Sequence, residues 1–206
     1  MSPPSDLYLI RHAQSTWNSS GRWQGQADPS LSPLGVVQAV ELAARFPLEL
    51  PVTRVLSSDL VRARHTAEPI AARFGTKLEL DESLREIDVG SWSGKTREEI
   101  GREQPGALDR YYRGEEGWTG GETFAVHEAR SAQVAGRLAG LEAEGAVVVV
   151  THGGTLRAIV RTLLEIPHAE RWRMSGPGHT SLTHVRRSPH GWRLLAFNAT
   201  FDVVDA

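Results

Sequence analysis

Short stretches rich in apolar residues recur along this chain and are separated by polar segments. Three of them have the length and composition of strands buried in a parallel sheet. They are Leu7–Ile10, Val52–Leu56 and Ala146–Val150. A shorter stretch at 77–80 predicts a fourth strand. We therefore expect these segments to form a largely parallel sheet.

Other segments place apolar residues three and four positions apart, which is the spacing of an amphipathic helix. Ser32 and Pro33 predict the start of one helix, and Pro47 predicts its end. Its apolar face carries Val36, Val37, Val40, Ala43 and Ala44. A second helix, with Ser58 or Asp59 as its expected N-cap, reaches about position 74. Further helices are expected at 96–103, at 107–112, from 121–123 onward and after Gly154.

Two stretches near the carboxyl end, at 180–185 and 192–197, flank the turn 188–191 and predict an antiparallel hairpin. Strands that alternate with helices build a sheet that is covered on both faces. The expected fold class is α/β, a three-layer α/β/α sandwich with a mixed, mostly parallel central sheet. The length of 206 residues suits one domain, 1–206. Within it, the segment at about 95–122 is interpreted as a lid that sets specificity or as a solvated insertion.

Composition and charge narrow the range of functions. The net charge of −2 argues against a general basic surface for nucleic acid. The chain has no cysteine, which excludes disulfides, thiol nucleophiles and cysteine-ligated zinc, and its histidines lack metal-site spacing, so we expect no metal and no cofactor. It shows neither a signal peptide nor a long apolar run, so we expect a cytoplasmic protein without a membrane partner. The sequence carries no pattern that identifies the oligomeric state, so a homodimer stays a possible assembly.

Two histidines and two arginines follow the predicted strands. Arg11 and His12 come after the first stretch, and His152 comes after the third. Arg62 lies in the first turn of the helix that follows the second. The carboxyl ends of parallel strands are where α/β proteins bind ligands, so these side chains should converge. Guanidinium groups that donate in a fork, beside imidazoles, favour an anion with several oxygens, and phosphate fits best.

A glycine pair and a group of carboxylates complete this candidate site. Gly153 and Gly154 allow close approach of the backbone, and the free N–H groups of the helix that follows would face an anion. The loop after the short fourth strand carries Glu82, Glu86 and Asp88. Spacing alone does not choose among these three as the acid of the site.

Four motifs around these residues occur in a characteristic order. They are Arg11-His12-Ala13-Gln14-Ser15; Ser57-Ser58-Asp59-Leu60-Val61-Arg62-Ala63 with Thr66-Ala67; Leu84-Arg85-Glu86 with Gly90 and Gly94; and Thr151-His152-Gly153-Gly154. With them the chain resembles the histidine phosphatase superfamily, also called the phosphoglycerate mutase-like family. The first motif departs from the family pattern at Ala13, where glycine is usual. A methyl group fits there only if the backbone needs no positive φ.

The resemblance implies a phosphoglycerate mutase-like fold and a metal-independent hydrolase of a small phosphomonoester. It implies that His12 is the nucleophile and forms a phosphohistidine intermediate. Arg11, Arg62 and His152 would hold the phosphate oxygens, and Glu86 would be the proton donor. That role requires a protonated carboxyl group, so we expect partial burial and the dianionic substrate to raise the pKa of Glu86.

Further positions have matches near the phosphate or substrate of the family. They are Ser15, Asn18, Gln24, Gly25, Gly153 and Glu122. Glu122 has a competing structural interpretation, because a carboxylate in a first helical turn stabilises the helix dipole. His127 lies on a mostly inward helical face and is interpreted as a structural histidine. Four tryptophans are interpreted as packing anchors or as an apolar rim of the site: Trp17, Trp23, Trp92 and Trp118.

Two other functions stay open. A cofactor-dependent phosphoglycerate mutase would return the phosphoryl group to a second hydroxyl of the substrate. The chain looks short for such a mutase, and Arg110 and Arg113 are separated by two tyrosines instead of forming an adjacent pair. A non-catalytic protein that binds a phosphorylated ligand is the second alternative, although a binder needs no proton donor.

Overall fold

A computed structural model describes residues 6–46 and 51–200 of the chain, so Pro47, the predicted end of a helix, lies outside the described residues. The strands are β1 (Asp6–Arg11), β2 (Val52–Ser57), β3 (Leu78–Leu80), β4 (Ala146–Thr151), β5 (Leu182–Ser188) and β6 (Gly191–Ala199). They form one sheet in the order β3-β2-β4-β1-β5-β6. Strands β3, β2, β4 and β1 pair in parallel, and β5 is antiparallel to both β1 and β6. The mixed, mostly parallel sheet and the closing hairpin are therefore confirmed.

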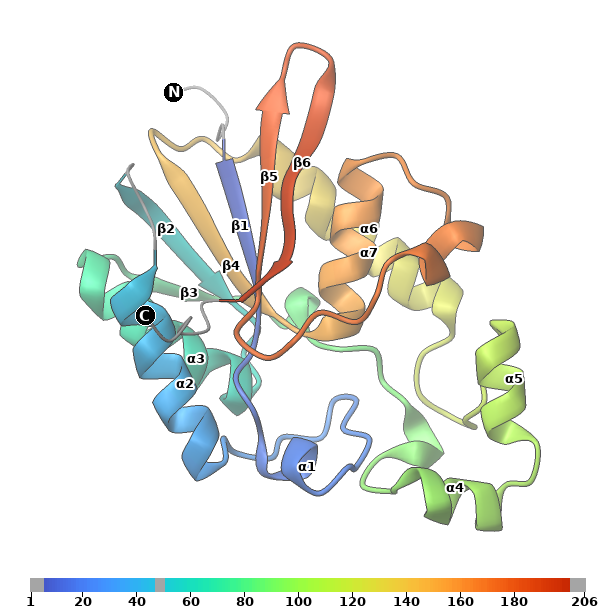
Figure 1. The fold of residues 1–206 in the computed structure, drawn as a ribbon. Helices are drawn as coiled ribbons and strands as arrows, with labels where there is room; N and C mark the ends of the chain where they lie inside the picture. The colour runs from blue at the N-terminus through green and yellow to red at the C-terminus, as the bar shows by residue number, and fades with distance from the viewer. Residues whose placement is uncertain (1–5, 47–50, 201–206) are drawn as a thin grey trace.

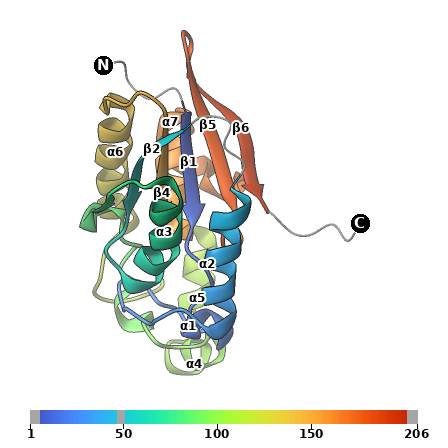
Figure 2. The same cartoon turned by 90° about the vertical axis from the view of Figure 1, so that its left-hand side faces the viewer.

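Helices cover both faces of the sheet. The α-helices are α1 (Thr16–Ser19), α2 (Pro33–Arg45), α3 (Val61–Phe74), α4 (Arg97–Glu103), α5 (Ala107–Arg113), α6 (Phe124–Gly140) and α7 (Gly153–Leu163). Short 3-10 turns are η1 (Glu82–Leu84), η2 (Gly90–Trp92) and η3 (His168–Arg173). Helices α2 and α3 lie on one face and α6 and α7 on the other (Figures 1 and 2). The predicted three-layer α/β/α sandwich is confirmed.

Strand β4 shows why the apolar stretches form the centre of the sheet. All of its residues are buried. Val147 and Val149 belong to the core beneath α6 and α7, whereas Val148 and Val150 belong to the core beneath α2 and α3. Side chains alternate between the two faces of a strand, so a continuous apolar run can fill both cores.

The predicted apolar face of α2 is wrong except at Ala43, which is buried. Its valines are about half exposed: Val36 at 53%, Val37 at 52% and Val40 at 56%. The helix instead buries a face that includes Gly35, Ala39 and Leu42. A Cβ atom on Gly35 would lie 2.0 Å from the carbonyl oxygen of Gln14, so this glycine allows the helix to approach the chain after β1. The small residues Gly35 and Ala39 let this face of α2 pack closely against the rest of the protein, and for that reason this face is the buried one.

The predicted cap of the helix after β2 is also wrong. Helix α3 begins at Val61, and its N-cap Leu60 has no capping side chain. Ser58 and Asp59 are engaged elsewhere, with His152 and Arg85 respectively. The Asp28 carboxylate instead accepts a hydrogen bond of 2.7 Å from the Val61 N–H. A distant loop thus satisfies one of the free donors at the start of α3.

Candidate active site

The carboxyl ends of β1, β2 and β4 meet at a cavity of about 420 Å³. Because Arg11 pairs with Thr151 in the parallel register, the residues that follow them leave the sheet side by side. The ring centroids of His12 and His152 are 5.1 Å apart. Arg62 reaches the same cavity from the first turn of α3. The predicted convergence of two histidines and two arginines is therefore present.

His12 is held in one orientation by the backbone. Its side chain is buried, and Nδ1 lies 2.7 Å from the carbonyl oxygen of Ala13. A carbonyl only accepts hydrogen bonds, so Nδ1 carries the hydrogen and Nε2 keeps its lone pair. Burial, followed by the charges of Arg62 and Arg11, holds the pKa of His12 well below its usual value. The imidazole is therefore neutral and nucleophilic near pH 7.

Ala13 fits this loop without strain. It is fully buried, and its backbone stays outside the left-handed region. Its N–H donates to the Thr66 hydroxyl at 3.0 Å. The backbone at this position therefore needs no positive φ, and a methyl group fits. Thr66, from the motif that carries Arg62, supports the loop that carries His12.

The arginines are fixed and still have donors free. Arg62 is 1% exposed and donates to the carbonyl oxygens of Ala27 and Gly25 at 2.7 and 2.8 Å. Arg11 donates to the Pro177 carbonyl oxygen at 2.7 Å. Among the described residues, the Nε atom of each arginine has no partner. Burial lowers the pKa of Arg62 to about 10, so its charge persists at neutral pH. These unpaired donors suit an anion.

His152 faces His12 in the same cluster. Its Nε2 lies 2.9 Å from the Ser58 hydroxyl, and its Nδ1 has no partner among the described residues. Burial, followed by the charge of Arg62, holds the pKa of His152 well below its usual value. When the Ser58 hydroxyl donates to Nε2, Nδ1 carries a hydrogen that an anion oxygen can accept.

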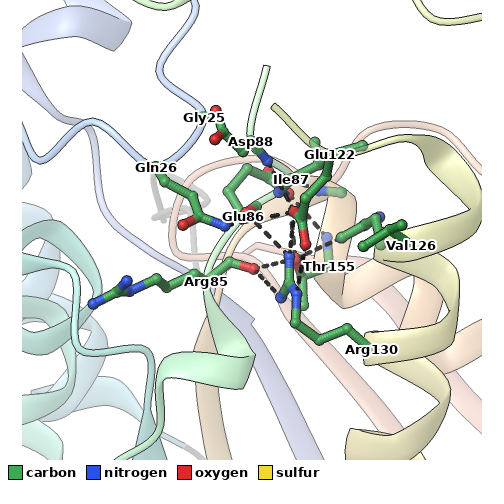
Figure 3. Close-up of polar contacts among 12 residues, drawn as sticks. Gly25, Gln26, Arg85, Glu86, Ile87, Asp88, Glu122, Val126, Arg130 and Thr155 are labelled. Atoms are coloured by element: carbon green, nitrogen blue, oxygen red, sulfur yellow. Dashed lines mark hydrogen bonds and ion pairs between the residues drawn. The ribbon is translucent and has the colours of Figure 1, made fainter. Parts of the chain in front are cut away.

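Glu86 is the acid that the fold brings to the cavity. Its carboxylate accepts hydrogen bonds from the N–H groups of Gly154, Thr155 and Ile87 at 2.9, 3.1 and 3.0 Å (Figure 3 shows Glu86 beside Thr155). A Cβ atom on Gly154 would lie 2.5 Å from Glu86 Oε1, so glycine lets this carboxylate lie against the start of α7 without shifting. Of the three acids that spacing left open, only Glu86 lines the cavity. Glu82 pairs with Arg85 at the surface.

The expected contribution of burial to the pKa of Glu86 is present but does not prevail in the protein alone, and the contribution of the dianionic substrate stays a prediction. Burial does raise the pKa of this carboxyl group. The charge of His127 and the backbone N–H donors lower it by more, and the net direction is downward. His127 is buried, in line with its inward-facing position, and its Nε2 lies 2.9 Å from the Thr155 hydroxyl. It also lines the cavity.

The predicted substrate loop lies at the cavity, with one residue behind it. Asn18, Gln24, Gly25 and Gly153 line the cavity. Ser15 is fully buried, caps α1, and lies with its hydroxyl 2.7 Å from Gln24 Oε1. Ser15 therefore orients the loop that faces the cavity.

Glu122 is engaged in a structural network (Figure 3). Its carboxylate accepts hydrogen bonds from Arg130 at 2.9 and 2.7 Å and from the Asp88 N–H at 3.0 Å. It directly precedes Thr123, the N-cap of α6, so its predicted place in the first helical turn is wrong. Arg130 also donates to the carbonyl oxygen of Arg85 at 2.8 Å. The ion pair therefore ties α6 to the loop that carries Glu86.

We expect the Glu122→Gln substitution to lower the free energy of unfolding by about 1–3 kcal/mol, because it leaves the largely buried Arg130 charge without its partner. Urea unfolding measures the change. Glu115→Gln removes an exposed partner of Arg113 and should have little effect. Unchanged stability together with a raised KM would instead make Glu122 a substrate contact.

Aromatic side chains of the segment at 95–122 pack with Trp23 and Trp92 in one cluster beneath the cavity wall. Trp92 is fully buried and makes an edge contact with Trp23, with ring centroids 4.8 Å apart. Trp23, Trp118 and Tyr111 line the cavity. Trp92 therefore anchors the wall, and Trp23 and Trp118 form part of the rim, whereas Trp17 does not line the cavity.

Sequence reasoning missed the far wall of the cavity, which includes Arg157, Arg161, Arg171 and Trp172. Gly153, Arg157 and Arg161 are four residues apart on α7, and this spacing was a usable signal. Arg171 and Trp172 lie in the irregular η3 turn, where no periodicity marks them.

Within residues 6–46 and 51–200, no group of three His, Cys, Asp or Glu side chains could hold a metal ion. A search of the same residues finds no helix with the length and apolar character needed to span a membrane.

Comparison with known proteins agrees with this geometry. The sequence model described as histidine phosphatase superfamily, branch 1, matches residues 7–200. The chain is 36% identical over 217 residues to the glucosyl-3-phosphoglycerate phosphatase of Mycobacterium tuberculosis, with 96% of each chain covered. It is 36% identical over 159 residues to the metal-independent phosphoserine phosphatase of Arabidopsis thaliana, covering 75% of this chain and 67% of that protein.

A solved structure shares the whole fold. The mycobacterial glucosyl-3-phosphoglycerate phosphatase in complex with VO3 superposes with a TM-score of 0.83 at 34% identity, covering 95% of this chain and 100% of that chain. The sequence match, the solved structure and the motif order agree with one another. The chain belongs to branch 1 of the histidine phosphatase superfamily.

Proposed function

We propose that this protein hydrolyses a small phosphomonoester through a phosphohistidine on His12. The observation that carries the proposal is the neutral His12 imidazole, whose Nδ1 is bonded to Ala13 and whose Nε2 lone pair is free. Arg11 and Arg62 flank it with unpaired donors. Nucleophile, cationic clamp and carboxyl group thus share one cavity, which is the combination that phosphoryl transfer requires.

In the first step, Nε2 of His12 attacks phosphorus in line with the ester oxygen. The N–P bond forms as the P–O bond breaks, and Glu86 gives its proton to the leaving alkoxide. Arg11, Arg62 and His152 offset charge on the equatorial oxygens. A phosphate dianion beside Glu86 favours the protonated carboxyl group, which counteracts the lowered pKa of this residue.

In the second step, water replaces the imidazole on phosphorus. The Glu86 carboxylate accepts a proton from the water as the O–P bond forms. The N–P bond breaks, His12 returns to its neutral form, and inorganic phosphate leaves. Glu86 therefore ends the cycle protonated and ready for another ester.

The relatives named above are phosphatases of glucosyl-3-phosphoglycerate and of phosphoserine. We assign to this chain the same broad class, a small phosphorylated metabolite. The segment at 95–122 acts as the specificity wall, because Arg97, Tyr111 and Trp118 reach the cavity from it.

Incubation with 3-phosphoglycerate separates hydrolysis from the mutase reaction. Of the arginines weighed for a mutase substrate, Arg110 donates to the Gly117 carbonyl and Arg113 pairs with Glu115, and neither lines the cavity. Arg97 does line it and could supply one basic contact. We expect free phosphate to be released, with no burst of the 2-isomer. Isomer formation faster than phosphate release would establish the mutase. Phosphate binding without turnover of any ester in a broad panel would establish a binding protein.

A further inference from the structure

The cavity carries far more positive than negative charge. Seven arginines line it: Arg11, Arg22, Arg62, Arg97, Arg157, Arg161 and Arg171. Among the residues that the structure describes, two carboxylates accompany them, Glu86 and Glu128. One reacting phosphate uses the donors of Arg11 and Arg62, so the remaining cations need another explanation.

Local contacts hold three of these remaining arginines, two by an ion pair and one by a hydrogen bond. Arg22 pairs with Glu99 at 2.9 Å. Arg161 is 3% exposed and pairs with Glu128, whose carboxylate also lies 3.1 Å from His168 Nδ1. Arg97 is exposed and donates to the Tyr112 hydroxyl. Among the described residues, Arg97, Arg157 and Arg171 have no carboxylate partner. Arg97 is exposed, which leaves Arg157 and Arg171 as the half-buried cations without one.

Arg157 lies next to the proposed phosphate clamp, which is formed by Arg11, Arg62 and His152. It lies one helical turn beyond Gly153, whose Cβ position would be 3.7 Å from Arg11 Nε. Its own hydrogen bonds, to the carbonyl oxygens of Gly153 and Met174, are both long at 3.3 Å. Four residues of α-helix span roughly 6 Å, so the Arg157 backbone lies about that far along α7 from the clamp.

Arg171 is preorganised by aromatic rings. Its guanidinium carbon lies 5.1 Å from the ring centre of Phe124 and 4.9 Å from that of Trp172. It donates to the Gly114 carbonyl oxygen at 2.9 Å, and its Nε has no partner among the described residues. Burial, followed by the nearby Arg161 charge, lowers the pKa of Arg171. An anion beside this guanidinium would favour its charged form. A guanidinium held this way loses little side-chain entropy when it binds.

We propose that Arg157 and Arg171 form a second anion-binding subsite, which takes a carboxylate or a second phosphate group of the same substrate. The inference rests on the proposed function. It narrows the substrate to phosphomonoesters whose second anionic group is separated from the reacting phosphorus by a spacer. Tyr111 and Phe124 line the cavity with these arginines and provide aromatic surface for that spacer.

Matched aryl phosphates test the subsite. 4-Carboxyphenyl phosphate carries the second anion, 4-carbamoylphenyl phosphate has nearly the same shape without the charge, and 4-(phosphonomethyl)phenyl phosphate replaces the carboxylate with a phosphonate. We expect kcat/KM to favour the charged compounds over the carboxamide by about tenfold, as one charge-assisted contact supplies. The stronger of the two charged compounds identifies the preferred anion.

Arginine variants locate the effect. Arg157→Gln and Arg171→Gln should each reduce the ratio of kcat/KM between the charged compounds and the carboxamide to near one. Arg173→Gln is the matched control, because Arg173 lies in the same η3 turn, is 76% exposed and does not line the cavity. It should retain the full preference. Phosphate release from the carboxamide compound reports that each variant is folded.

The outcomes separate the two proposals. Equal kcat/KM for the charged and neutral compounds would overturn the subsite and leave the phosphatase intact. A preference that survives both arginine substitutions would also overturn it. If no compound releases phosphate, the proposed function fails. The subsite is then tested by calorimetry, in which the charged compounds should bind about tenfold more tightly than the carboxamide.

Discussion

The His12→Ala variant loses at least three orders of magnitude in kcat for every phosphomonoester it is given. The imidazole supplies the nucleophile, and its removal raises the barrier by about 4 kcal/mol or more. Arg11 and Arg62 remain in place, so the variant still binds inorganic phosphate and the loss appears in kcat. Phosphate release under saturating substrate, with calorimetric phosphate binding, measures both quantities.

Two further variants show whether the loss belongs to the imidazole. His12→Asn keeps a side-chain N–H near the Ala13 carbonyl and should be as inactive as His12→Ala, because it has no nucleophilic nitrogen. His190→Ala alters an exposed histidine of the β5–β6 turn and should be fully active. A His12→Ala variant with substantial turnover would show that another group attacks phosphorus.

The Glu86→Gln variant loses about 10²–10⁴ in kcat with an alkyl phosphate. The amide oxygen can still accept the N–H groups of Thr155 and Ile87, which both donate to Oε1 of Glu86, whereas the Gly154 N–H donates to Oε2 and loses its acceptor. The side chain no longer carries a transferable proton. 4-Nitrophenyl phosphate should lose much less, since its leaving group departs without protonation. In the wild type, kcat with the alkyl phosphate falls as pH rises through the pKa of Glu86 in the complex. That alkaline decline is absent from the variant.

The leaving-group comparison makes this prediction specific. Asp88→Asn is the control, because Asp88 belongs to the same loop and accepts the Gly90 N–H at 3.0 Å without lining the cavity. It should leave the contrast between the alkyl and nitrophenyl substrates unchanged. Equal losses for both substrates in Glu86→Gln would show that this residue positions the substrate and transfers no proton to the leaving group.

Features encoded by neighbouring residues were predictable from the sequence. The run at 146–150 is apolar at every position because β4 is covered on both faces. The hairpin follows from two runs flanking a short turn, and the chemistry follows from polar residues placed where strands end. Each feature depends on contacts within one element or on a general property of parallel sheets.

Features decided by distant contacts were not predictable. The valines of α2 satisfy helical spacing, yet Gly35 allows a different face to approach Gln14. Asp28, more than thirty residues earlier in the chain, caps α3. The choice of Glu86 over its neighbours depends on N–H groups at the start of α7, which follow it by almost seventy residues in the chain. The Arg171 site depends on how η3 packs against Phe124.

Trapping the covalent intermediate tests the central claim most directly. The wild-type protein is mixed with a substrate labelled with ³²P, quenched within milliseconds into alkali, where phosphohistidine survives, and digested. Mass spectrometry then locates the label. We predict label on the peptide that contains His12, transferable to water on the time scale of turnover, and none in His12→Ala. Steady phosphate release with no label on His12 at any quench time, or with the label on another residue, would contradict the account.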